Sequence, residues 1–250
     1  MSENAPLEDP VEEGRRVVEA ADDAGLTVRQ IGGTAIWEHA ETVREGPFER
    51  DYRDVDFVAT TAEEGDVVDL MVDELGYEAN KRFNTMRRFR LEFFDEENDR
   101  KADYILDRFE FCHQWSLKDR LDVDYPTVPI EDLLMSKIQI VEASDRDVRD
   151  IVAMVNDHPV QARDDTEVID PRYIADLCKD DWGLYRTTTD SIDRVEEYLQ
   201  TNDLPVDETE LSDRLESIRN KIESEPKTLR WKLRSVIGEH KQWYDQPELT

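Results

Sequence analysis

Two adjacent glycines at the start of a helix, followed by a strand that opens with two aspartates, constrain this chain more than any other feature. Within residues 31–60, Gly32 and Gly33 precede a helical pattern, and Asp54 and Asp56 begin the next strand. A glycine-opened helix start lets phosphate approach the free backbone N–H groups closely. Carboxylates at positions i and i+2 of a strand point to one face, where they can share a divalent cation. Together these features predict a site for a metal-bound nucleoside triphosphate.

The Asp-x-Asp spacing is weak evidence by itself, because 62 of the 250 residues are acidic. The same spacing recurs at Asp122/Asp124 and Asp145/Asp147, in polar segments where a solvated role is expected. Asp54 and Asp56 differ because the apolar run Phe57-Val58-Ala59 follows them directly. A charge at the start of a buried strand normally requires a metal or a partner. The context of the first pair therefore favours a binding site.

This order of elements resembles the nucleotidyltransferase superfamily, which includes DNA polymerase beta, kanamycin nucleotidyltransferase and the minimal nucleotidyltransferases. Within it the chain is most similar to abortive-infection toxin nucleotidyltransferases of toxin-antitoxin pairs. Their pattern is Gly-Gly-Thr-Ala, a helix, an Arg and then Asp-Ile-Asp. Gly32-Gly33-Thr34-Ala35 matches the first part, and Arg50 precedes Asp54 by four residues, as in that pattern. The chain departs from the family at Tyr52, where Ser or Thr is frequent.

A hairpin is predicted after residue 86, and its second strand carries the third carboxylate that the superfamily requires. Residues 86–94 alternate between apolar and charged side chains, and the polar run 95–100 is typical of a turn. Pairing the strands about that turn places Asp103 opposite Glu92, with Arg90 on the same face. Asp103 lies between apolar neighbours, as the family's third aspartate does.

Asp107 is the other aspartate of this segment. Arg108 follows it, so it lacks the apolar neighbours of the family's third aspartate. Pairing about the same turn places Asp107 opposite Arg88. We interpret Asp107 as a surface carboxylate near Arg88, and Asp103 as the candidate for the site.

A further resemblance involves a helix with a Leu-Leu pair and Lys137, followed by a helix that opens Arg-Asp-x-x-Asp. The toxin family has both. By analogy Lys137 would reach the triphosphate, while Asp147 and Asp150 would act in the substrate site or tie the two helices together. A structural role is equally open for this pair, because carboxylates in the first turn of a helix are favoured by its dipole.

The resemblance implies an α+β fold, with a mixed sheet and flanking helices, and a Mg²⁺-dependent nucleotidyltransferase activity. The enzyme would move a nucleoside monophosphate from a triphosphate to a hydroxyl of an RNA end, a protein side chain or a small molecule. Asp54, Asp56 and Asp103 would hold two Mg²⁺ ions, and Asp103 would also align or deprotonate the acceptor. The residues expected to bind the nucleotide are Gly32, Gly33, Thr34, Arg50, Arg90 and Lys137. The alternative is a non-catalytic nucleotide-binding or antitoxin-like module with a protein or RNA partner.

The charge balance predicts a cytoplasmic protein of a salt-accumulating halophile. The formal net charge is −30, and only nine lysines accompany 23 arginines. Such a surface is favoured in molar salt, because screening there reduces the range of the repulsion between like charges to a few ångströms. The two cysteines, Cys112 and Cys178, form no metal-binding or disulfide framework. An acidic N-terminal segment and the lack of an apolar run of about 20 residues predict no signal peptide and no membrane span.

The chain is expected to form two domains, a nucleotidyltransferase domain of residues 1–160 and a helical domain of residues 161–250. Before the hairpin, periodicity predicts helices over residues 11–24, 34–43 and 63–75 and strands over residues 26–31 and 54–60. Beyond residue 160 only helical signals occur. Two apolar stripes at helical spacing define the last helices, namely Leu211, Leu215, Ile218 and Ile222, and Leu229, Leu233, Val236 and Ile237.

Overall fold

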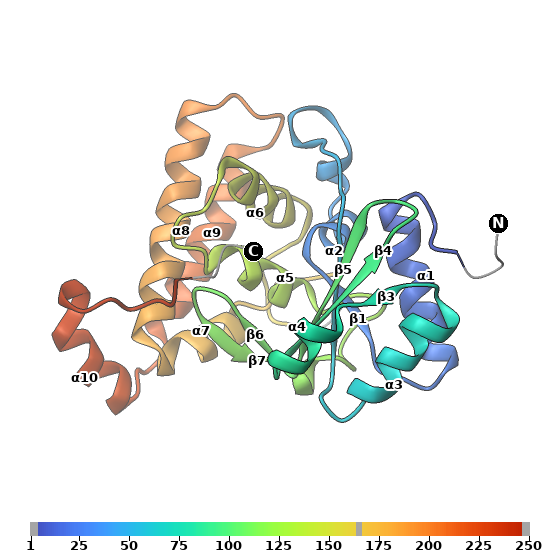
Figure 1. Ribbon diagram of the computed structural model, residues 1–250. Helices are drawn as coiled ribbons and strands as arrows, with labels where there is room; N and C mark the ends of the chain where they lie inside the picture. The colour runs from blue at the N-terminus through green and yellow to red at the C-terminus, as the bar shows by residue number, and fades with distance from the viewer. Residues whose placement is uncertain (1–4, 164–166, 247–250) are drawn as a thin grey trace. The chain divides into compact units, whose positions relative to one another are not determined.

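The computed structural model describes residues 5–163 and 167–246, and the chain divides into two compact units (Figure 1). The first unit comprises residues 1–38, 50–109 and 116–129, and the second comprises residues 39–49, 110–115 and 130–250. The sequence predicts a boundary near residue 160, whereas the second compact unit includes the chain from Ile130 onward. The helix that begins at Ile130 explains this difference, because seven of its first eight residues are buried and need helices around them.

A five-stranded sheet forms the centre of the first unit, with strand order β1-β2-β5-β4-β3. Strands β2 and β5 run parallel, and the other neighbours run antiparallel, so the sheet is mixed. The predicted α+β class and mixed sheet are confirmed. The strands are β1 (Arg29–Ile31), β2 (Val55–Ala59), β3 (Glu78–Ala79), β4 (Arg90–Asp95) and β5 (Arg100–Leu106).

The apolar core of the first unit lies on one face of this sheet. Alternate residues of β2 and β5, such as Phe57 and Tyr104, pack there against Val17 and Val18 of one helix and Met71 of another. In Figure 1 these helices lie beside the sheet, and they are α1 (Pro10–Asp23) and α3 (Glu64–Asp69), which continues as the π-helical turn η3 (Leu70–Glu74). Because side chains of a strand alternate, the residues between the core positions face the other side.

Local signals explain where these helices begin and end. Asp9 precedes Pro10, and its carboxylate accepts hydrogen bonds from the first N–H groups of α1. The α3/η3 helix is followed by Gly76 at φ 79°, a left-handed conformation that is typical of the glycine after a helix. The helix expected over residues 34–43 begins at Gly32 and ends at His39. The remaining short elements of the chain up to residue 129 are η1 (Glu41–Arg44), η2 (Gly46–Phe48), α4 (Lys81–Met86), β6 (Arg108–Glu110), β7 (Gln114–Ser116) and η4 (Lys118–Arg120).

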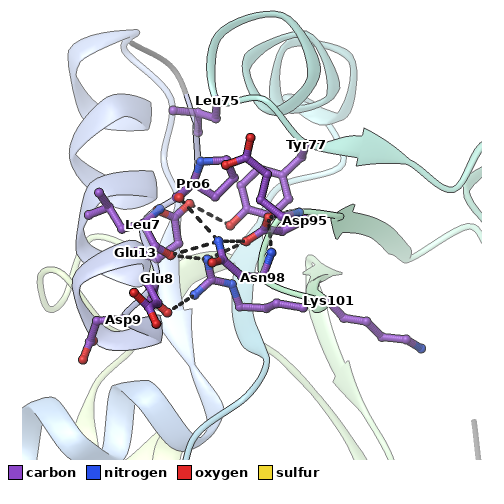
Figure 2. Close-up of polar contacts among 12 residues, drawn as sticks. Pro6, Leu7, Glu8, Asp9, Glu13, Leu75, Tyr77, Asp95, Asn98 and Lys101 are labelled. Carbon is purple, nitrogen blue, oxygen red and sulfur yellow. Dashed lines mark hydrogen bonds and ion pairs between the residues drawn. The ribbon is translucent and has the colours of Figure 1, made fainter. Parts of the chain in front are cut away.

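A buried polar network joins α1 to the β4–β5 hairpin within the first unit (Figure 2). Glu13 is fully buried and accepts hydrogen bonds from the Tyr77 hydroxyl at 2.7 Å and from Arg16. Arg100 and Asp95 form an ion pair at 2.6 Å, with side chains 2% and 1% exposed. Arg100 also donates to a backbone carbonyl of the segment that leads into α1. Burial, and then the charge of Glu13, raise the pKa of Tyr77.

The second unit is helical from Ile130 onward, which confirms the predicted helical C-terminal region. All four residues of the stripe that starts at Leu211 are buried in α9. No helix in residues 5–163 or 167–246 is long and apolar enough to span a bilayer. The helices are α5 (Ile130–Ile138), α6 (Asp145–Asp157), α7 (Pro171–Asp180), α8 (Trp182–Thr201), α9 (Glu208–Ser224) and α10 (Leu229–Ile237), followed by the turn η5 (Gly238–His240).

The last helix, α10, exposes its apolar stripe. Leu229, Leu233, Val236 and Ile237 are 72%, 64%, 84% and 45% exposed. The helix instead contacts its neighbours through its other face. The Trp231 ring packs edge-on against Tyr185 at a centroid distance of 5.2 Å, and the Arg234 guanidinium lies 4.7 Å from the centre of the Trp182 ring. Aromatic and cation–π contacts, rather than packing of the leucine side chains, therefore hold α10 against its neighbours.

Candidate functional site

Asp56 and Asp103 lie side by side on the face of the sheet that is opposite the core. They are register partners in the parallel strands β2 and β5, and Glu92 of β4 is the partner of Asp103 on its other side. The predicted pairing of Asp103 with Glu92 is confirmed, and the strands that carry Asp56 and Asp103 are neighbours in one sheet. Residues 47 positions apart in the sequence thus form one row of carboxylates.

Asp54 lies just before β2 and is exposed. Its Oδ1 accepts a hydrogen bond of 3.2 Å from the backbone N–H of Lys101, at the start of β5. The carboxylate oxygens of Asp54, Asp56 and Asp103 do not all lie within 4.8 Å of one another. Among the described residues, the group that meets this limit consists of other side chains, in the second unit. Two ions about 3.5–4 Å apart can bridge carboxylates that a single ion cannot. Oxygen donors alone are the ligand set that Mg²⁺ prefers.

Burial, more than the neighbouring charges, shifts the pKa of Asp103. Burial raises its pKa, and the charges of Glu92 and Asp54 add to that effect, while Arg90 and Lys101 oppose it. Arg90 pairs with Ile105 and therefore faces the same side of the sheet as Asp103, as predicted. A carboxyl with a raised pKa takes up a proton more readily than an ordinary aspartate, which suits a general base.

Gly32 brings the start of α2 (Gly32–His39) against the carboxylate of Asp56. Gly32 has φ +77°, and a Cβ at this position would lie 2.3 Å from Oδ2 of Asp56. The left-handed backbone conformation disfavours any other residue here, and a side chain would also force the Asp56 carboxylate to move. The helix start at Gly32 and the strand that carries Asp56 are therefore in contact, and this contact requires a glycine at position 32.

Gly33 lies against Arg50 and Tyr52. A Cβ on Gly33 would approach Cδ1 of Tyr52 to 2.9 Å and Nη2 of Arg50 to 3.1 Å. The Arg50 guanidinium stacks over the Tyr52 ring, 4.7 Å from its centre. The cation of Arg50 thus lies beside the N-terminus of α2, where a phosphate would be bound. Thr34, the next residue, is buried, and its hydroxyl has no hydrogen-bond partner among the described residues.

Lys137, Asp147 and Asp150 belong to the second unit, where they tie α5 to α6. The Lys137 ammonium lies 2.8 Å from Oδ1 of Asp147 and 3.0 Å from Oδ2 of Asp150. Asp147 also completes a capping box with Ser144 at the start of α6. These contacts agree with the helix-tying interpretation of the acidic pair. A role of Lys137 at a triphosphate stays a prediction.

The ion pair between Lys137 and Asp147 gives a testable pH dependence. Burial alone would lower the pKa of Lys137, but the charges of Asp150 and Asp147 outweigh it and raise that pKa. Burial would likewise raise the pKa of Asp147, but Lys137 outweighs it and lowers that pKa. The stabilisation that Lys137 contributes to the folded state is therefore fully present below its unfolded pKa of about 10.4. The stabilisation that Asp147 contributes is fully present above its unfolded pKa of about 3.9. Both contributions are present between about pH 5 and pH 9.

We expect Lys137→Met to lower the free energy of unfolding by about 3 kcal/mol at pH 7, because it leaves buried carboxylates unpaired. Below pH 4 the difference from wild type should shrink, since protonation of Asp147 removes the charge that Lys137 neutralises. Urea unfolding of both proteins at pH 7 and pH 3, at constant KCl, measures the two differences. An equal difference at both pH values would contradict this account.

Asp107 is not the exposed surface carboxylate that its sequence context predicts. It is half-buried with φ 61°, and its carboxylate accepts hydrogen bonds from the N–H of Thr61 at 3.1 Å and from the Thr61 hydroxyl at 2.5 Å. Its own N–H donates to the carbonyl of Ala59. Asp107 therefore closes the ends of β2 and β5, a role that alternation within the hairpin could not reveal.

A group of possible metal ligands that the sequence did not predict lies in the second unit, formed by His39, His158 and Glu167. These residues are far apart in the chain and follow no spacing that is typical of a metal motif. Comparison of the chain with protein-family models and with curated proteins found no match. The assignment of a function therefore depends on the geometry of the sites themselves.

Proposed function

We propose that this chain is a Mg²⁺-dependent nucleotidyltransferase with the nucleotidyltransferase fold. The contact of Gly32 with Asp56, beside Asp103 on the adjacent parallel strand, carries this proposal. It joins a helix N-terminus suited to phosphate with carboxylates suited to a divalent cation. The reaction is transfer of a nucleoside monophosphate from a nucleoside triphosphate to an acceptor hydroxyl.

Each residue of the first unit takes a definite role in this proposal. Asp54 and Asp56 would hold the metal ions, which, when bound, neutralise charge on the phosphates and the leaving group. Asp103 accepts the proton of the attacking hydroxyl, and its raised pKa favours that step. The N-terminus of α2 and Arg50 bind the triphosphate, and Arg90 limits repulsion among the carboxylates.

The runner-up is a non-catalytic nucleotide-binding or antitoxin-like module that binds a protein or RNA partner. The position of Tyr52 favours it, because the ring fills the space beside Gly33 where the resemblance expects a small hydroxyl residue. The deciding experiment incubates the chain in high KCl with Mg²⁺ and each labelled NTP. The acceptor pools are total RNA, cell protein and aminoglycosides. Covalent label in any pool supports the enzyme.

Nucleotide binding should be abolished by Gly33→Val. The new side chain would collide with Tyr52 and displace Arg50 from the helix start. Equilibrium dialysis with labelled ATP and Mg²⁺ measures the affinity. The matched control is Gly65→Val, because a Cβ at Gly65 meets nothing within 4 Å. Unchanged ATP affinity in Gly33→Val, with the fold intact by circular dichroism, would count against the site.

A further inference from the structure

Three residues of the second unit bring together the ligand types of a transition-metal site. One ligand atom each from His39, His158 and Glu167 lies within 4.8 Å of the other two. The two imidazole rings meet edge to face, with centroids 5.8 Å apart and an interplanar angle of 64°. The residues come from three separate segments, namely the end of α2, the residue after α6, and the stretch that precedes α7. We propose that His39, His158 and Glu167 bind one divalent transition-metal ion such as Zn²⁺.

Both ring nitrogens of His158 face carbonyl oxygens. His158 is 3% exposed, and its Nδ1 lies 3.0 Å from the carbonyl oxygen of Glu167, while its Nε2 lies 3.2 Å from the carbonyl oxygen of His39. A neutral imidazole has a single N–H and can donate to only one of these oxygens. Its other nitrogen then directs a lone pair at a carbonyl. A bound metal ion would accept that lone pair.

Nearby charges bear on whether a cation can enter this group of side chains. Arg163 is the nearby positive charge that would oppose a cation, and it is engaged in an ion pair with the buried carboxylate of Glu131.

The ligand set selects the class of metal and the kind of site. Two imidazoles and one carboxylate suit Zn²⁺, Co²⁺ or Ni²⁺, whereas Mg²⁺ and Ca²⁺ prefer oxygen ligands alone. Three protein ligands leave a fourth position for water. The Glu167 side chain is 64% exposed, so that position is open to solvent. An ion here would cross-link three segments of the second unit and is independent of the proposed nucleotide site.

Titration of the full chain with Co²⁺ tests the site, in high KCl and without Mg²⁺ or nucleotide. We expect one ion per chain, with the visible absorption of a low-coordinate Co²⁺ site, and displacement by Zn²⁺. Glu167→Gln keeps the size of an exposed side chain and should weaken binding by at least about 10-fold. His158→Gln should abolish it. The matched control is His240→Gln, which removes an exposed histidine of η5 and should bind as wild type does.

Two results would overturn the proposal. One is the lack of stoichiometric Co²⁺ binding by the wild-type chain. The other is equal binding by the wild type and Glu167→Gln, which would place the ion elsewhere. Circular dichroism checks that each variant is folded. If His158→Gln unfolds, Glu167→Gln and His240→Gln still decide the question.

Discussion

Asp56→Asn should abolish nucleotide transfer and leave the chain folded. The substitution removes the charge that holds Mg²⁺ at nearly constant volume, and it relieves repulsion from the neighbouring Asp103. Loss of such a charge clamp commonly lowers the rate by a factor of about 100 or more. Transfer of labelled nucleotide to the acceptor that wild type uses measures the effect. The matched control is Asp122→Asn, an exposed aspartate of another Asp-x-Asp pair, which should transfer at the wild-type rate.

This experiment also separates the two proposed functions. If wild type transfers nucleotide and Asp56→Asn does not, while Asp122→Asn does, the enzyme is supported. If wild type labels no acceptor, and partner binding survives in Asp56→Asn, the binding module is the better account. Equal transfer by wild type and Asp56→Asn would contradict the role of Asp56 as a metal ligand.

The second large effect is expected on stability, from Arg100→Met. Arg100 and Asp95 are almost fully buried, and Arg100 also holds a backbone carbonyl before α1. Removing one member of a buried ion pair leaves the other charge uncompensated, which costs about 3–5 kcal/mol. Because the whole stability of a domain is about 5–15 kcal/mol, this variant should be close to unfolding. Urea unfolding at constant KCl measures the loss.

A second variant tests the cause of that loss. Arg100→Met combined with Asp95→Leu removes both charges, so part of the stability should return. The control Arg82→Met changes an exposed residue of α4 and should alter the free energy of unfolding by less than about 0.5 kcal/mol. A loss below about 1 kcal/mol in Arg100→Met would contradict the importance of the buried pair.

Alternation and turn signals were sufficient to predict the β4–β5 hairpin of the first unit. The hairpin register followed from apolar residues at every second position, because a shift by one residue would turn the core side chains outward. This register also brings Asp103 opposite Glu92. The division into units was not predictable in this way. Residues 39–49 belong to the same unit as helices that follow much later in the chain. Local sequence patterns predict only domains that are contiguous in the sequence.

The last two helices show why a periodic pattern does not determine burial. The stripes of α9 and α10 have similar residues at similar spacing, yet Leu215 is buried and Leu233 is 64% exposed. In α10 the contact is made by Trp231 and Arg234 on the other face. Periodicity identifies a helix, but the partner that covers a face is a tertiary property.

The candidate site was predictable in its residues and not in its contacts. The motif identified Gly32 and Asp56, but the close approach of one to the other depends on a left-handed glycine that sequence does not report. The carboxylate of Asp107 accepts a hydrogen bond from the hydroxyl of Thr61, a residue 46 positions away. The contacts of Lys137 with Asp147 and Asp150 required the packing of α5 on α6, so only the general possibility of a helix tie was visible beforehand.

The parallel pairing of β2 with β5 has a consequence for the order in which the chain folds. The β4–β5 hairpin closes a turn of a few residues, so Glu92 and Asp103 can come together within microseconds. Asp56 joins them only when a loop of nearly 50 residues closes, and the entropy lost in closing a loop must be overcome before such distant contacts form. We therefore expect the carboxylate row to be completed late. Partly folded chains would contain the pair of Glu92 and Asp103 without Asp56 beside it.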